Sequence, residues 1–182
     1  MNAPDGFPTN AIYGFIKVLE KMRKGVEPTH IAVIWDGGLD EERTEMLEDY
    51  KADRDPMPDD MELQLDCIVE WLEASGIYTL CLKGVEADDM IGTLAKQAEA
   101  AMFEVVVASA DKDFFQLINT NIKLLNPNDK TGTLWGEPQV EAKTGVHPEQ
   151  IVDWLSLMGD AVDGITGVPG VGTKTAAKLL IE

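Results

Sequence analysis

The sequence has few cysteines, little positive charge and no long apolar run. Cys67 and Cys81 are its only cysteines, and they lack the spacing of a metal-binding motif. We expect both to be reduced core residues, since disulfides are rare in the cytoplasm. No apolar run approaches the roughly 18 residues of a membrane-spanning helix. The N-terminal residues MNAPDGFPTN also lack the basic and apolar regions of a secretory signal, so we predict a cytoplasmic protein.

The scarcity of basic residues argues against general polyanion binding. The chain has 15 Lys and Arg against 33 Asp and Glu, a formal net charge of -18. A basic patch is the usual signature of nucleic-acid binding, and this composition does not supply one. A metal site lined by carboxylates would account for part of the acidity. The length of 182 residues and 45% hydrophobic content fit one domain, or one domain with a small appendage.

The most informative stretch is GVEADDMIG, residues 84–92, in which three acids immediately precede an apolar helical pattern. If a helix begins near Ala87, Glu86 and Asp89 share one of its faces. Carboxylates this close raise one another's pKa, and a divalent cation with oxygen ligands removes the repulsion. The alternative is that acids simply favour a helix N-terminus through the macrodipole.

Two other predicted strands also end in acids. Asp36 closes the apolar run in HIAVIWDGG, and Asp111 and Asp113 follow the run in EVVVASADKDFFQL. The strand IYTLCLK leads into the 84–92 cluster. Ligands bind at the carboxyl ends of parallel strands. A single acid could be a helix cap. Caps alone do not account for acids at three successive strand ends, so the pattern predicts a carboxylate metal site.

The charged run from Asp40 to Asp60 has two interpretations. It is either an exposed, mobile segment or a lid over the acidic cluster. In the second case Arg43, Lys51 and Arg54 supply the cations that a phosphate needs.

A glycine-rich turn follows a further pair of acids, Asp160 and Asp163. GVPGVGTKTAAKLL places three glycines before a lysine-bearing helix, so backbone N–H groups there can hold a phosphate without a large basic patch. The turn lacks the spacing of a Walker A loop.

Taken together, these motifs resemble those of the 5′-nuclease family, which comprises the 5′–3′ exonuclease domain of bacterial DNA polymerase I, its phage relatives and the flap endonucleases. The matching segments are PTNAIYGF, WDGG, Arg43 followed by YKADR, VEADDMIG, ASADKDFFQL and LMGDAVDGITGVPGVGTKTA. The resemblance implies an α/β fold: a PIN-like, mostly parallel central sheet flanked by helices, with a helical arch. It also implies a small C-terminal helix-hairpin-helix module that grips duplex DNA. We expect the nuclease domain over residues 1–144 and a partial module over residues 145–182.

The resemblance also implies site residues and cofactors. Its metal ligands would be Asp36, Glu86, Asp88 and Asp89 at one position and Asp111, Asp113, Asp160 and Asp163 at the other. Two Mg²⁺ or Mn²⁺ ions would bind there. Arg43, Lys51 and Arg54 match basic arch residues that polarise the scissile phosphate. The DNA-contacting residues would be Gly167, Gly170, Gly172, Thr173, Lys174, Thr175 and Lys178.

The implied activity is metal-dependent hydrolysis of DNA phosphodiesters near the 5′ ends of branched or nicked duplexes, in repair and replication. The chain departs from the family pattern because it lacks the first strand with its Asp ligand and stops within the helix after the hairpin. It also carries Gly164 and Thr166 where the family usually has Asn and Pro. These departures indicate a fragment, a misassigned start or a degenerate relative. They put catalysis in question more than the fold.

Further expectations and two alternatives accompany this hypothesis. An incomplete sheet predicts self-association, or filling of the gap by another segment. A longer parent protein could also carry a polymerase. The first alternative function is a non-catalytic, metal-dependent module that binds branched DNA. The second is a PIN-type ribonuclease, which the hairpin disfavours because it suits duplex DNA.

Overall fold

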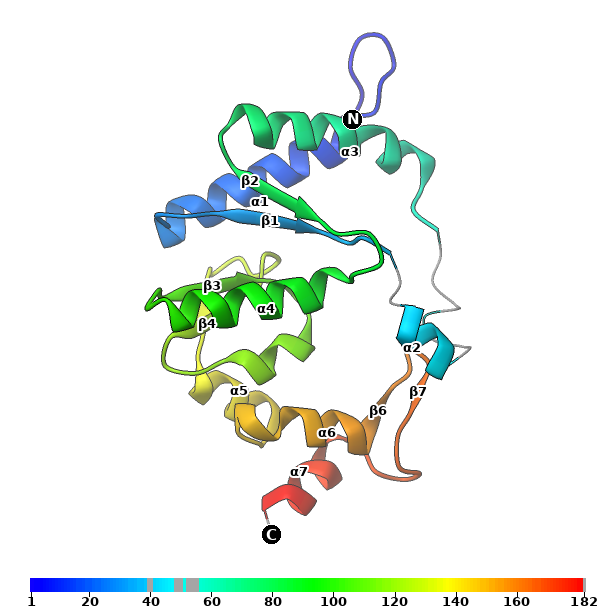
Figure 1. Ribbon diagram of the computed structural model, residues 1–182, viewed down its shortest axis with the longest axis vertical. Coiled ribbons are helices and arrows are strands. Elements are labelled where there is room, and N and C mark those ends of the chain that lie inside the picture. The colour runs from blue at the N-terminus through cyan, green and yellow to red at the C-terminus, as the bar shows by residue number, and fades with distance from the viewer. Residues whose placement is uncertain (39–40, 48–50, 52–55, 182) are drawn as a thin grey trace.

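The computed structural model describes residues 1–38, 41–47, 51 and 56–181, and Figure 1 shows their arrangement. The elements follow the chain as α1 (Asn10–Val26), β1 (Ala32–Trp35), α2 (Glu41–Met46), α3 (Asp59–Ala74), β2 (Tyr78–Cys81), α4 (Ala87–Ala100), β3 (Val105–Ala108), η1 (Lys112–Leu117), β4 (Ile122–Leu125), β5 (Leu134–Trp135), α5 (Glu137–Thr144), η2 (Pro148–Gln150), α6 (Ile151–Met158), β6 (Gly159–Asp160), β7 (Ile165–Thr166) and α7 (Thr173–Ile181).

The described strands form two main sheets. Strands β1 and β2 pair in parallel, and β3 pairs in parallel with β4, which carries β5 antiparallel at its other edge. Helix α4 contacts both β1 and β3, so it spans the two sheets. The α/β fold class is confirmed. The expected central sheet is present in two parts, since no described strand pairs between β1 and β3.

A small core joins α1 and α3 to the first sheet. It contains Leu19, Ile68, Leu72 and Ile77. Gln64 of α3 is fully buried beside it, and its Oε1 accepts hydrogen bonds from the backbone N–H groups of Ala11 (2.8 Å) and Ile12 (3.3 Å). Thr9, which precedes α1, makes no side-chain cap. Gln64 therefore satisfies backbone donors at the start of a helix that lies 52 and 53 positions earlier in the chain.

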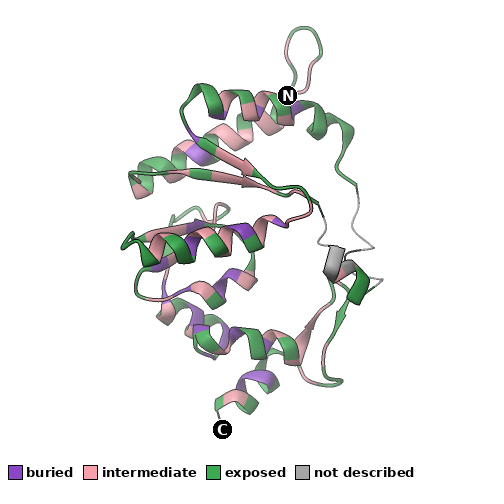
Figure 2. Ribbon diagram, viewed as in Figure 1, coloured by how far each residue is buried: buried purple, intermediate pink, exposed green. Residues whose placement is uncertain are grey.

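A larger core joins the second sheet to the C-terminal helices. Its buried members include Phe114, Ile122, Val140, Ile151, Trp154 and Ala176. Figure 2 shows buried residues along α4, η1, α5 and α6, with further ones on α7. Trp154 Nε1 donates to the carbonyl of Thr173 (3.2 Å) and thereby fixes the start of α7. The C-terminal segment thus shares its apolar interior with β3 and β4.

The cysteine prediction was wrong in part. Cys81 is exposed and Cys67 is only half-buried, although both have free thiols as expected. Cys81 is the last residue of β2, where the chain leaves the sheet, so its apolar pattern does not place it in the core. None of the described helices is long and apolar enough to cross a membrane.

Candidate functional site

The first acidic group gathers where the loops after β1 and β2 meet. The N–H of Gly37 donates to the carbonyl of Val85 (3.1 Å), and the N–H of Gly84 donates to the carbonyl of Gly37 (2.9 Å). A Cβ on Gly37 would lie 1.7 Å from the carbonyl oxygen of Leu82. Only glycine permits this approach, which explains the first glycine of WDGG.

Helix α4 begins at Ala87, as predicted, and presents its acids at that junction. Glu86 is the N-cap residue and is 1% exposed, yet its side chain makes no capping hydrogen bond. Asp88 and Asp89 lie in the first turn. Asp36 instead accepts a hydrogen bond from the N–H of Gly38 (2.9 Å), so it serves as a local turn cap in addition to any metal role.

Two of the predicted basic residues contact these acids directly. The Nζ of Lys51 donates to Glu86 Oε2 in a buried ion pair. The two terminal nitrogens of Arg43 lie 3.3 Å from Glu86 Oε2 and 2.8 Å from Asp89 Oδ1. Arg43 belongs to α2, which lies beside the N-terminal end of α4. Arg54, the third predicted cation, lies outside the described residues.

The second acidic group forms where η1 meets β6 and β7. Asp111 caps η1, its side chain accepting from the N–H of Asp113 (3.0 Å). Asp160 is the last residue of β6, and its Oδ2 lies 2.6 Å from Lys112 Nζ. The sequence reasoning missed Lys112. Its place between two acids in the run Asp111-Lys112-Asp113 was the available signal, since a cation flanked by acids lowers their repulsion.

Lys51 also links the two groups. Its backbone N–H donates to the carbonyl of Asp163 (3.4 Å) while its side chain holds Glu86. Asp163 lies in the turn between β6 and β7, next to Gly164, which has φ +75°. A glycine adopts that left-handed conformation without strain.

Burial raises the pKa of two of these acids, whereas a hydrogen bond from a lysine lowers the pKa of a third. Burial, reinforced by the nearby Asp111, raises the pKa of Asp113 to about 6. Burial also raises the pKa of Asp88, with Glu86 adding to the shift. The hydrogen bond from Lys112 lowers the pKa of Asp160. Burial therefore disfavours the charged forms of Asp113 and Asp88.

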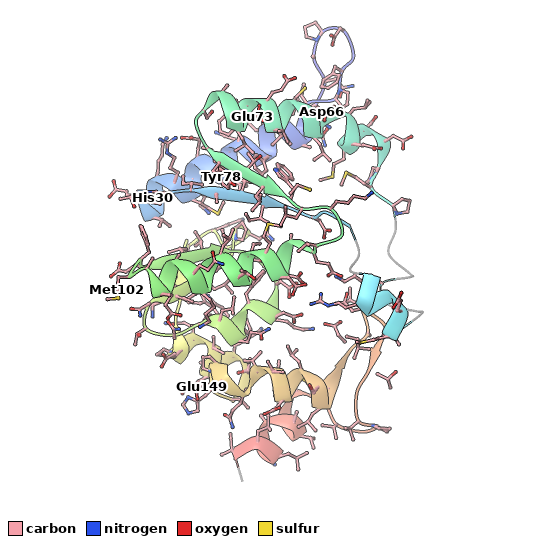
Figure 3. The ribbon with its side chains drawn as sticks, in the orientation of Figure 1. His30, Asp66, Glu73, Tyr78, Met102 and Glu149 are labelled. Carbon is pink, nitrogen blue, oxygen red and sulfur yellow. The ribbon has the colours of Figure 1, made fainter. Side chains whose placement is uncertain are left out.

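A cleft of about 690 Å³ brings the two groups together. Its acidic lining residues are Asp88, Asp89, Asp113 and Asp163, and Arg43 lines it as well. Asp36, Glu86, Asp111 and Asp160 do not line it. Figure 3 shows Met102, just beyond the C-terminal end of α4, on the opposite side of the molecule from α2. The acidic end of α4 therefore faces the cleft.

The carboxylate groups at the cleft are of the chemical kind that binds hard divalent cations. All eight predicted ligands offer carboxylate oxygens, which Mg²⁺ and Mn²⁺ prefer. Asp113 Oδ1 is buried and has no hydrogen-bond partner in the described structure. Among the described residues, no three His, Cys, Asp or Glu side chains are grouped closely enough to hold an ion in their present positions. Binding would thus require these side chains to move closer together.

The predicted DNA-contacting residues lie on and after the glycine-rich turn. The N–H of Val171 donates to the carbonyl of Val168 (3.0 Å), and Gly170, with φ +78°, occupies the turn position that requires a left-handed conformation. A Cβ on Gly167 would lie 2.1 Å from the backbone of Met158, so that glycine is needed for packing. The remaining residues of the set are exposed: Gly172, Thr173, Lys174, Thr175 and Lys178.

Comparison with known proteins places this chain among nucleases. Residues 1–145 match the family model of the 5'-3' exonuclease N-terminal resolvase-like domain, and residues 146–182 match that of the 5'-3' exonuclease C-terminal SAM fold. DNA polymerase I of Pseudomonas aeruginosa is 45% identical over 175 residues, which cover 96% of this chain and 19% of the polymerase. The 5'-3' exonuclease of Aquifex aeolicus is 40% identical over 181 residues, covering 99% of this chain and 62% of that protein.

Solved structures show the same fold at lower identity. The T5 D15 protein co-crystallised with metal ions has a TM-score of 0.76 at 23% identity, over 96% of this chain and 68% of its own. The catalytic core of Rad2 in complex with a DNA substrate has a TM-score of 0.61 at 19% identity, covering 94% of this chain and 52% of the Rad2 chain. The chain spans less than two thirds of both curated relatives.

Proposed function

The chain belongs to the 5'-3' exonuclease family, and on that premise we propose that it hydrolyses DNA phosphodiesters near the 5′ ends of branched or nicked duplexes. One observation carries the proposal. Acids from α4, η1 and the β6–β7 turn line a single cleft together with Arg43. Such a cleft concentrates negative charge that only cations can compensate, and a phosphodiester needs cations to enter it.

The eight predicted acids would hold two divalent ions, Mg²⁺ or Mn²⁺. Bound ions of this kind activate water and stabilise the leaving oxygen of a phosphodiester. Asp88 and Asp113 are the strongest candidates among the chain's ligands, because burial disfavours their charged forms and a cation would restore them. Asp36 and Asp111 would bind while keeping their turn-capping hydrogen bonds.

Arg43 and Lys51 would orient the scissile phosphate, with Arg54 as a third predicted cation. Both contact Glu86 now, so a phosphate entering the cleft meets donors that are already next to the acids. Arginine forms bidentate hydrogen bonds to phosphate oxygens, and lysine acts as a point charge.

The duplex would lie on the C-terminal module, for which we propose residues 145–182. Exposed N–H groups around Gly170 and Gly172, followed by Lys174 and Lys178, suit backbone phosphates. The net charge of -18 makes this binding weak, salt-sensitive and dependent on divalent ions.

We further propose three features of its setting. The chain acts in the cytoplasm beside a polymerase, as its similarity to DNA polymerase I suggests. It also self-associates through the edges of β1 and β3 that pair with no other described strand. A monomeric mass by light scattering would refute the last point.

A non-catalytic module that binds branched DNA is the second candidate. The observation that favours it is that no three acids among the described residues are grouped to hold an ion.

Cleavage of a 5′-labelled flapped duplex in Mg²⁺ or Mn²⁺ separates the two candidates. The nuclease proposal expects metal-dependent cutting that Asp88→Ala and Asp111→Ala both abolish. Metal-dependent binding without cutting would establish the second candidate. Preference for single-stranded RNA over flapped DNA would instead indicate a ribonuclease.

A further inference from the structure

The solvent-facing side of α1 carries a stripe of lysines. Lys17, Lys21 and Lys24 recur at i, i+4 and i+7, a spacing that places them on one face of a helix. All three are exposed, and the helix packs its opposite face into the small core. Lys17 Nζ lies 5.6 Å from the centre of the Tyr13 ring, and Lys21 Nζ donates to the carbonyl of Asp129 (2.8 Å). An ammonium group has three donors, so this lysine stripe can still meet other groups.

Helix α3 carries acids at the same spacing. Asp66, Glu70 and Glu73 also recur at i, i+4 and i+7, are exposed, and lie opposite the apolar face of their helix. Asp59 and Glu62 extend this acidic stripe towards the start of α3. Figure 3 shows Asp66 and Glu73 along that helix. None of these five acids forms an ion pair within the described part of the chain.

The two stripes lie on neighbouring helices. Helices α1 and α3 contact each other, and both contribute residues to the small core beside β1 and β2. Exposed residues run along both helices in Figure 2. Because each helix turns its apolar side into the same core, the lysine stripe and the acidic stripe face solvent next to each other.

Local structure does not account for this separation of charge. Like charges at i and i+4 destabilise a helix, whereas opposite charges at that spacing stabilise it. Helix α1 nevertheless has four basic residues against one acid, and α3 has six acids and no basic residue. A single charged stripe is usually just a solvated face. Two adjacent stripes of opposite sign and equal spacing, each unfavourable within its own helix, indicate a partner that carries both signs.

A second copy of this chain is the partner that fits. A nucleic acid on the lysine stripe would also face the acidic stripe beside it, which repels a polyanion. A two-fold axis running between α1 and α3 instead places α1 of one copy over α3 of the other, and the reverse. Each helix is about 25 Å long, and packed helices lie about 8–10 Å apart, so the face covers on the order of 500 Å². That is below the roughly 800 Å² per partner of stable complexes, which predicts weak and reversible pairing.

We propose that two copies of this chain associate through the α1–α3 face, with the lysine stripe of each copy against the acidic stripe of the other. No residue of either stripe lines the acidic cleft. The face is also distinct from the free edges of β1 and β3. The inference therefore stands apart from the nuclease proposal.

Sedimentation velocity in EDTA, over a range of protein concentrations, tests the proposal. The unsubstituted chain should form dimers at about 0.1 M salt, where the Debye length of about 10 Å screens distant charges more than contacting ones. The dimer should dissociate at about 1 M salt, where that length is about 3 Å.

Two charge-reversal variants make the test specific. One combines Lys17→Glu, Lys21→Glu and Lys24→Glu, and the other combines Asp66→Lys, Glu70→Lys and Glu73→Lys. Each variant alone should associate at least about tenfold more weakly than the unsubstituted chain, since like charges then face each other. An equimolar mixture of the two should recover a dimer, because the reversed α1 of one variant faces the reversed α3 of the other. Recovery also shows that both variants are folded.

The other outcomes overturn the inference. If only the acid-reversed variant, six units more positive, associates, then net charge controls association. If both variants associate as strongly as the unsubstituted chain, the edges of β1 and β3 carry the contact instead. A monomeric unsubstituted chain at every concentration also refutes it. If the lysine reversal weakens binding of a DNA duplex without changing the mass, the stripe binds nucleic acid instead. Each of these results leaves the nuclease proposal to its own cleavage assay.

Discussion

Replacing Lys51 by methionine should destabilise the protein far more than an ordinary lysine substitution. The Lys51 side chain is 5% exposed and its partner Glu86 is 1% exposed, so the substitution strands a buried carboxylate. Removing one partner of a buried pair costs about 3–5 kcal/mol. Arg43, 3.3 Å from the same oxygen, offsets part of that cost, so we expect about 3 kcal/mol in metal-free buffer.

Urea unfolding in EDTA, followed by tryptophan fluorescence, measures this loss directly. Lys96→Met is the matched control, because it also removes a lysine from a lysine–glutamate pair, but one that is half-exposed. It should cost far less than Lys51→Met, because an exposed ion pair contributes little to stability. Adding Mg²⁺ should recover part of the loss in Lys51→Met, since a divalent ion can replace the missing cation beside Glu86.

The double variant Lys51→Met with Glu86→Gln provides the decisive comparison. With no buried charge left, it should be more stable in EDTA than Lys51→Met alone. A loss below about 1 kcal/mol for Lys51→Met, equal to that of the Lys96→Met control, would refute the reasoning by showing that water solvates the pair.

Three further substitutions probe the site and the fold. Asp113→Asn should have the same stability as the unsubstituted protein at about pH 4 and exceed it by on the order of 1 kcal/mol at about pH 7.5 in EDTA. The raised pKa makes the native acid favour its protonated form, so the contribution of Asp113 to stability is lost as pH rises through about 6. Equal pH profiles of the two proteins in urea titrations would contradict this. Gly167→Ala should lower the melting temperature measured by calorimetry by several degrees, because its Cβ would lie 2.1 Å from the backbone of Met158. Gly172→Ala is the control, because a Cβ there would have nothing within 4 Å. Leu72→Ala should cost about 2–5 kcal/mol by chemical denaturation, since that side chain is fully buried, and a cost near that of the exposed Leu63→Ala would argue against the packing described.

Local pattern was sufficient for most of the elements and for the positions of the acids relative to them. The apolar runs before Asp36 and Asp111 form β1 and β3, and α4 begins at Ala87 as its spacing indicated. These features depend on neighbours within a few residues, which the sequence displays directly. The family resemblance, carried by motifs of the same short range, was confirmed by the family models.

Partners far apart in the chain could not be predicted in this way. Gln64 satisfies the start of α1 across 53 positions, and Lys112 holds Asp160 across 48. Neither pairing leaves a periodic signal, because a side chain that hydrogen-bonds to a distant segment needs only to be long enough and suitably placed by packing. The exposure of Cys81 was not predicted for a related reason. The pattern of its strand predicts which face points inward, but it does not predict where the sheet ends.

The sequence by itself therefore determined at which strand and helix ends the acids lie. Only the tertiary structure decided how those ends meet. It places Lys51 and Arg43 on Glu86, brings Asp113 and Asp163 into the cleft with Asp88, and extends that cleft along α4 to Lys96. Secondary structure follows from short-range sterics and hydrogen bonds, whereas ion pairs and clefts arise from long-range packing that no local pattern encodes.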